Sequence, residues 1–197
     1  MSTRANIRIY REDGTKTGIY CHSDGYIENL GVILQTYYST ADRVEKLLAL
    51  GHCSSVDAKI PESADDFMKY TEWAKGLYPD YEAGYCIPYT MWRGEEFGQQ
   101  VCDEEYNYIF VESEACWIVQ NERKVHSKIL DEDWYGGYDS RFLIDAIVSD
   151  VSEKYWDLWA KEGVTKESCI KAAKEARVEL ERKRAAEYEA YYRAYCD

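Results

Sequence analysis

The chain has 197 residues, 46% of them hydrophobic, and a formal net charge of −13. This length and composition support a stable core in one large domain or two small ones. No stretch reaches the roughly 18 to 20 apolar residues of a membrane-spanning helix. The negative charge argues against direct binding to nucleic acid or to an anionic membrane.

The cysteines indicate a reducing environment. There are seven of them, an odd number, and no two form a C-x-x-C pair. Disulfide frameworks and zinc sites usually show even or closely spaced cysteines. The first four residues are also not followed by the apolar segment of a signal peptide. We therefore expect a cytoplasmic protein.

The first fifty residues predict a β-hairpin followed by two helices. Residues 5–10 alternate apolar and polar side chains, and Asp13-Gly14 is a hairpin turn signal before a second strand at 17–21. Apolar residues then recur at helical spacing over 30–37, and again over 39–51. Gly51 is the expected stop of the second helix.

The remainder predicts a helix, a group of strands and further helices. Residues 61–80 have helical spacing, 80–105 read as loops and short strands, and three β-rich segments follow. Two long helices are expected after them. These segments are, in chain order, strands at 106–113, 115–122 and 124–130, and helices at 139–163 and from 166 onward.

The predicted fold class is therefore α+β, with an N-terminal β-hairpin plus two helices, a central antiparallel β-meander and long C-terminal helices. The expected boundary separates a unit at 1–56 from an acidic sheet-and-helix body at 57–197. One continuous domain is the alternative.

The stretch YCHSDGY at 20–26 concentrates reactive side chains, and it invites the hypothesis of a metal site or a catalytic site. Cys21-His22 and His52-Cys53 could meet in space, but adjacent side chains on an extended chain point apart, so we expect no metal. We also expect no catalytic residues, because the cysteines are better explained as buried apolar side chains. A cysteine hydrolase using Cys53 or Cys116 remains an alternative.

A structural turn is the favoured role for this stretch, with Gly25 supplying backbone freedom. The alternative is a ligand or enzyme site formed by His22, Asp24 and Tyr26. No cofactor is expected, because the phosphate-loop and dinucleotide-binding glycine motifs are missing from the sequence.

Most of the negative charge lies between residues 57 and 114, where fourteen acidic residues face four basic ones, a net of −10. Tyrosine and tryptophan are interleaved with these carboxylates, as expected of a face that binds a basic protein surface. The predicted contact residues are Asp80, Tyr81, Glu82, Glu95, Glu96, Asp103, Glu104, Glu105 and Tyr106.

The N-terminal region resembles uncharacterised proteins of bacteriophages and prophages. The similarity covers residues 2–56 and rests on STRANIRIY, on the H-x-D-G-Y pattern of His22 to Tyr26, and on DRVEKLLALGHCSS. Ser23 and Ile27 depart from the usual pattern, which often has Trp and Pro there. The resemblance implies a phage accessory protein, a setting in which small acidic proteins often inhibit host defence.

The favoured function is a non-enzymatic inhibitor of a bacterial defence system, of the anti-CRISPR or antirestriction type. Its partner would be a host protein with a basic nucleic-acid-binding surface, which the carboxylates contact in place of phosphates. One alternative is an enzyme or ligand-binding protein centred on His22 and Asp24. Another is a phage scaffold or assembly protein that self-associates, for example as a homodimer, through the helix at 165–196.

Overall fold

The computed structural model describes residues 3–61, 84–89, 104–121 and 140–195. Its strands form one seven-stranded sheet in the order β4-β3-β2-β1-β5-β6-β7. The pairs β1–β5 and β2–β3 are parallel, and the others are antiparallel. The strands are β1 (Ala5–Tyr10), β2 (Lys16–Cys21), β3 (Cys53–Ser55), β4 (Ile87–Pro88), β5 (Tyr106–Val111), β6 (Cys116–Asn121) and β7 (Ser140–Phe142).

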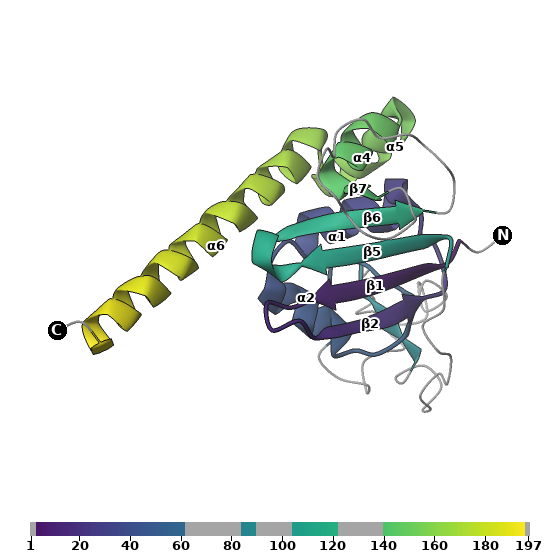
Figure 1. Ribbon diagram of the computed structural model, residues 1–197. Helices are drawn as coiled ribbons and strands as arrows, with labels where there is room; N and C mark the ends of the chain where they lie inside the picture. The colour runs from purple at the N-terminus through teal and green to yellow at the C-terminus, as the bar shows by residue number, and fades with distance from the viewer. Residues whose placement is uncertain (1–2, 62–83, 90–103, 122–139, 196–197) are drawn as a thin grey trace.

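Helices cover one face of this sheet (Figure 1). A π-helical turn, η1 (Ile27–Gly31), leads into α1 (Val32–Tyr37), and α2 (Ala41–Leu48) follows. After β7 come α4 (Leu143–Asp150), α5 (Glu153–Trp159), the 3-10 turn η5 (Ala160–Glu162) and the 30-residue α6 (Lys166–Tyr195). A second 3-10 turn, η4 (Glu112–Glu114), connects β5 to β6. The α+β class predicted from the sequence is confirmed.

The core lies between the sheet and these helices. Alternate residues of β1, namely Ala5, Ile7 and Ile9, have no exposed surface and join a cluster with Phe110 and Trp117 of β5 and β6. The Trp117 indole N–H donates a hydrogen bond of 2.8 Å to the carbonyl of Tyr38, which follows α1. The opposite face of the sheet also carries buried groups, because Asn6 and Ile109 are 0% and 1% exposed.

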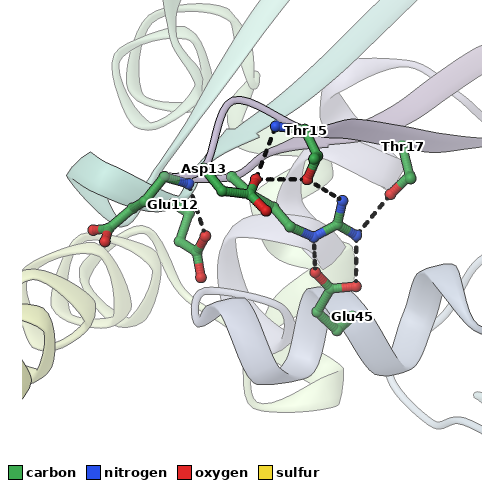
Figure 2. Close-up of polar contacts among 7 residues, drawn as sticks. Asp13, Thr15, Thr17, Glu45 and Glu112 are labelled. Atoms are coloured by element: carbon green, nitrogen blue, oxygen red, sulfur yellow. Dashed lines mark hydrogen bonds and ion pairs between the residues drawn. The ribbon is translucent and has the colours of Figure 1, made fainter.

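The turn of the N-terminal hairpin is attached to α2 (Figure 2). The Arg11 guanidinium holds Glu45 through Nε–Oε1 and Nη2–Oε2 contacts of 2.5 and 2.9 Å. Arg11 also donates to the hydroxyl oxygens of Thr15 and Thr17, while Asp13 accepts from the backbone N–H and the hydroxyl of Thr15. The Arg11–Glu45 pair therefore fixes the hairpin on the helix layer, although it lies at the molecular surface.

The structure corrects the single long helix expected over 139–163. Residues 140–142 instead form β7, which pairs with β6, and the helix is divided into α4 and α5. The division falls at Val151, which is extended (ψ 115°) and buried, with Ser152 extended as the N-cap of α5. Burying Val151 and pairing β7 outweigh the helical periodicity that the sequence shows there.

Several predicted segments lie outside the described residues. These are the helix at 61–80 beyond residue 61, most of the loops at 80–105, and the strand at 124–130. The strands at 106–113 and 115–122 correspond to β5 and β6, which pair antiparallel as predicted, and the third strand beside them is β7, from a segment predicted as helix. The parallel pairing of β1 with β5 joins this meander to the N-terminal hairpin in one sheet.

The helix α6 begins with a reciprocal cap, because Thr165 and Ser168 each donate a backbone N–H to the other's hydroxyl oxygen. Its first half packs on the body, where Cys169 and Ala176 are buried. Farther along, Arg184 donates to the Ser113 carbonyl at 2.6 Å and pairs with Glu12 at 3.2 Å. The last turns extend beyond the sheet-and-helix body (Figure 1).

Candidate functional site

The YCHSDGY stretch connects the end of β2 to η1 in a tight turn. Asp24 is in the left-handed region (φ 58°), whereas Gly25 is not. Gly25 is required for a different reason, because a Cβ there would lie 2.7 Å from the Ala5 Cβ. The expectation that Gly25 supplies backbone freedom is therefore wrong in detail, and its role is to permit close approach to the start of β1.

Backbone hydrogen bonds hold this turn in place. The Gly25 N–H donates to the Thr3 carbonyl, and the Gly25 carbonyl accepts from the buried Tyr108 hydroxyl, both at 2.9 Å. The Asp24 carbonyl accepts from the Leu30 N–H at 3.3 Å. These contacts join β1, β5 and η1 around the turn, which agrees with the structural role favoured by the sequence.

The turn also brings the two cysteine-histidine pairs together. Cys21 and Cys53 are direct partners across β2 and β3, and the His22 N–H donates to the Cys53 carbonyl at 3.0 Å. The two thiols lie in the buried core, whereas His22 and His52 contact the Tyr20 ring. The four side chains thus do not converge on one point. In the described part of the chain, no group of three or more His, Cys, Asp or Glu is placed to hold a metal ion.

Burial makes these thiols poor nucleophiles. It raises the pKa of Cys21 from 9.0 to about 12, and it raises the pKa of Cys53 well above its ordinary value. The thiols of Cys86 and Cys116 have their pKa raised by burial to about 11. Since the thiolate is the reactive form, these four cysteines remain protonated and unreactive near neutral pH.

Tyr20 is the centre of a cluster of polar rings at this end of the sheet. Its hydroxyl lies 2.8 Å from Nδ1 of His22, and its backbone N–H donates to Nδ1 of His52 at 2.9 Å. Tyr89, which comes directly after β4, packs edge-on against the His22 ring at a centroid distance of 6.5 Å. Because Nδ1 of His52 accepts a hydrogen bond, neutral His52 carries its proton on Nε2.

The environment of Tyr20 connects this cluster to the acidic segment. Burial raises the pKa of Tyr20, the positive charge of Arg4 opposes that shift, and the negative charge of Glu104 adds to it. The strand registers agree with this, because Asn6 of β1 pairs with Tyr20 on one side and with Asn107, three residues after Glu104, on the other. The His22 turn and residues 104–106 were predicted as separate sites, and the structure places both at the same end of the sheet.

The described acidic residues stand at the start of β5. Tyr106 pairs with Ala5 of β1, its ring stacks on Tyr108, and Glu105 next to it is exposed. Glu104 is partly buried, and its carbonyl accepts from the Asn107 side chain at 3.4 Å. The other predicted contacts lie outside the described residues; they are Asp80, Tyr81, Glu82, Glu95, Glu96 and Asp103.

The alternative site of His22, Asp24 and Tyr26 is not brought together as one group. The Tyr26 ring packs on Tyr155 of α5 at a centroid distance of 6.3 Å, whereas His22 contacts Tyr20 and Tyr89. Asp24 between them is exposed. Of the three residues, only His22 belongs to the ring cluster.

Sequence reasoning missed Tyr20 and Tyr89 as members of this cluster. Tyr20 lies in β2 and Tyr89 follows β4, and β3 lies between these two strands in the sheet. No short-range motif marks such an arrangement. The alternation along β2 does place Tyr20 on the face opposite Cys21, which was the available signal.

Comparison with known proteins finds no matching family model, no matching curated protein and no matching solved structure. Among the described helices, none combines the length and the apolar character needed to cross a membrane.

Proposed function

We propose that this protein is a phage-encoded inhibitor of a bacterial defence system, of the anti-CRISPR or antirestriction type, that acts in the host cytoplasm. It binds a basic nucleic-acid-binding surface of a defence protein with an acidic, tyrosine-rich face. The observation that supports this most directly is the position of Glu104 and Glu105 directly before β5, at the end of the sheet where β2 carries Tyr20.

The position of these residues suits recognition of a basic surface. Glu104 and Glu105 directly precede β5, which pairs with β1 and β6 from Tyr106 onward, so their backbone is attached to an interior strand of the sheet. Rigid carboxylates lose little conformational entropy when they pair with Lys or Arg. Tyr20 and Tyr89 are 1% and 4% exposed, so they support this end of the sheet from within, and the partner would contact the exposed carboxylates.

A binding role also agrees with the state of the cysteines. The described thiols with a strongly raised pKa are protonated near neutral pH, and protonated thiols do not attack substrates. The inhibitor would thus act by occupying a surface. Carboxylates that replace phosphates in such a contact lose affinity as the salt concentration rises.

Plaque counts on bacteria with a defined CRISPR or restriction system test this proposal. Expression of the protein should raise the number of plaques formed by a phage that the system targets. The double reversal Glu104→Lys with Glu105→Lys should abolish that protection. The matched control is Glu112→Lys with Glu114→Lys, which reverses two carboxylates just beyond the other end of β5 and should retain it.

Two results would contradict the proposal. One is an absence of protection against every defence system tested. The other is full protection by the Glu104/Glu105 variant when circular dichroism shows both variants folded, because the proposed face would then not be the inhibitory one.

A second candidate function, binding of a small polar ligand or catalysis at His22, is supported by the 2.8 Å contact between the Tyr20 hydroxyl and His22. A hydroxyl-imidazole pair can donate, accept or transfer a proton. The discriminating variant is His22→Ala. If it folds and loses protection while the Glu104/Glu105 reversal retains protection, the function lies in the ring cluster.

A further inference from the structure

The part of α6 that follows Ala176 carries a stripe of exposed apolar side chains. Val178, Tyr188 and Tyr192 are 54%, 69% and 52% exposed, and Ala185 lies between them. Large apolar side chains seldom gather on an exposed helix face unless a partner covers them. The stripe is defined here as Val178, Ala185, Tyr188 and Tyr192.

This stripe faces away from the body of the protein. The body side of α6 is marked by buried Ala176 and partly buried Leu180, together with Arg184, which is bonded to Glu12 and Ser113. Each helical residue advances by about 100°, which places Val178, Ala185 and Tyr192 about 120° to 180° from Ala176 and Leu180. Tyr188 lies at the edge of the stripe, about 40° from Arg184, and is 69% exposed. The body therefore does not cover the stripe.

The spacing of the stripe is that of a coiled coil. Val178, Ala185 and Tyr192 recur every seven residues, and Tyr188 lies three residues after Ala185. Val178, Ala185 and Tyr192 therefore occupy position a of the heptad. Position d is occupied by Glu181 in the first heptad and by Tyr188 in the second. We propose that the stripe binds the stripe of a second copy of this chain, with the two α6 helices antiparallel.

The antiparallel direction follows from side-chain size and charge. An antiparallel pair of helices places the a positions of one chain against the d positions of the other. The small Ala185 then contacts the large Tyr188 of the partner subunit, and by symmetry Tyr188 contacts Ala185 of the partner subunit. The same register places Glu181 opposite Tyr192 of the partner subunit, whose hydroxyl can donate to the carboxylate. A parallel pair would instead place Glu181 against Glu181 of the partner subunit, and like charges repel.

The residues beside the stripe are also complementary. Arg182 and Glu189 occupy the two e positions, and in this antiparallel register each faces the opposite charge on the other helix. In the single chain both lie on the surface, where Arg182 pairs with Glu179 and Glu189 pairs with Arg193. A symmetric dimer therefore forms two Arg182–Glu189 ion pairs between subunits, which satisfy these charges in the register of the stripe.

Sedimentation of the full chain over a hundredfold range of concentration tests the association. The mass should rise from 23.0 kDa towards twice that value as concentration increases. The variant Tyr188→Lys with Tyr192→Lys should remain monomeric. Ala190→Lys, which adds a lysine on the opposite side of the helix, should dimerise like the natural chain. A natural chain that remains monomeric, or a lysine stripe variant that still dimerises, would overturn the proposal.

Cysteine cross-linking tests the orientation. A mixture of Ala185→Cys and Tyr188→Cys chains should form a covalent heterodimer, whereas Ala185→Cys alone should not cross-link; the opposite outcome would show a parallel pair. Arg182→Glu should weaken association about tenfold, because two attractions become repulsions. Adding Glu189→Arg to it should restore dimerisation, and failure of that rescue would contradict the register.

Discussion

The Tyr20 hydroxyl lies 2.8 Å from Nδ1 of His22, and one residue separates them in the sequence. An extended strand places residues i and i+2 on the same face, so β2 and its first following residue bring the two rings together. The next strand in the sheet is preceded by His52, whose Nδ1 accepts the Tyr20 N–H. The ring cluster is thus produced by strand alternation and by the parallel pairing of β2 with β3.

Tyr20→Phe tests the strength of this contact. The variant removes the hydroxyl and leaves the ring, so the free energy of unfolding should fall by about 1 kcal/mol, the usual net value of one such hydrogen bond. The His22 imidazole resonances should shift in the NMR spectrum. Tyr10→Phe is the control, because Tyr10 is the last residue of β1, whereas Tyr20 pairs with Asn6 near the start of that strand. Unchanged His22 resonances would show that the contact is not formed in solution.

Gly25→Ala tests the close approach of the turn to β1. The new methyl group would lie 2.7 Å from the Ala5 Cβ and 3.0 Å from the Thr3 carbonyl oxygen, neither of which can move freely. Urea denaturation should show a loss of about 2 to 3 kcal/mol, the upper part of the range for overpacked cores. Gly14→Ala meets no atom within 4 Å and is strained only by its φ of 83°, so its cost should be about 1 kcal/mol. Equal losses for the two variants would contradict the steric explanation.

The buried thiols predict a loss of stability in alkaline solution. Cys21 titrates near pH 9 when unfolded and near pH 12 when folded, so the unfolded chain releases its proton first as the pH rises. The contribution of the neutral buried thiol is complete below pH 9 and is lost progressively between pH 9 and 12. The free energy of unfolding should fall over that range, and it should fall less steeply in Cys21→Ala.

The same thiols should react slowly with a thiol reagent at pH 8 in the native protein. In denaturant the reaction should be fast, because the pKa returns to its ordinary value. Rapid labelling of native Cys21, located by mass spectrometry, would contradict the assigned burial.

The capping of α6 predicts unequal effects at two helix starts. Thr165→Ala removes one half of the reciprocal cap with Ser168 and should cost about 1 kcal/mol of stability. Ser152→Ala at the start of α5 should cost less than about 0.5 kcal/mol, because the Ser152 side chain makes no capping hydrogen bond. Thermal unfolding of both variants measures the difference, and a larger effect at Ser152 would be the opposite of what the structure implies.

Local patterns in the sequence were sufficient for the hairpin, for α2 and for α6. In each case the signal lies within a few residues: Asp13-Gly14 at the hairpin turn, Gly51 after α2 with φ 72°, and Thr165 before α6. Such turns and caps act through neighbouring backbone groups, so they can be read without knowing what packs against them.

The tertiary structure decided the rest. The parallel pairing of β1 with β5 joins residues about a hundred positions apart, and no local pattern encodes which strand is the neighbour. That pairing brings the start of β5 to the end of the sheet that carries Tyr20, and the alternation along β2 separates the thiols from the imidazoles. The helix expected over 139–163 is interrupted at Val151, because burial of Val151 and pairing of β7 with β6 outweigh the helical periodicity. The sequence by itself determined the local elements and the acidity; only folding determined which side chains meet, because contacts between distant segments depend on the packing of the whole core.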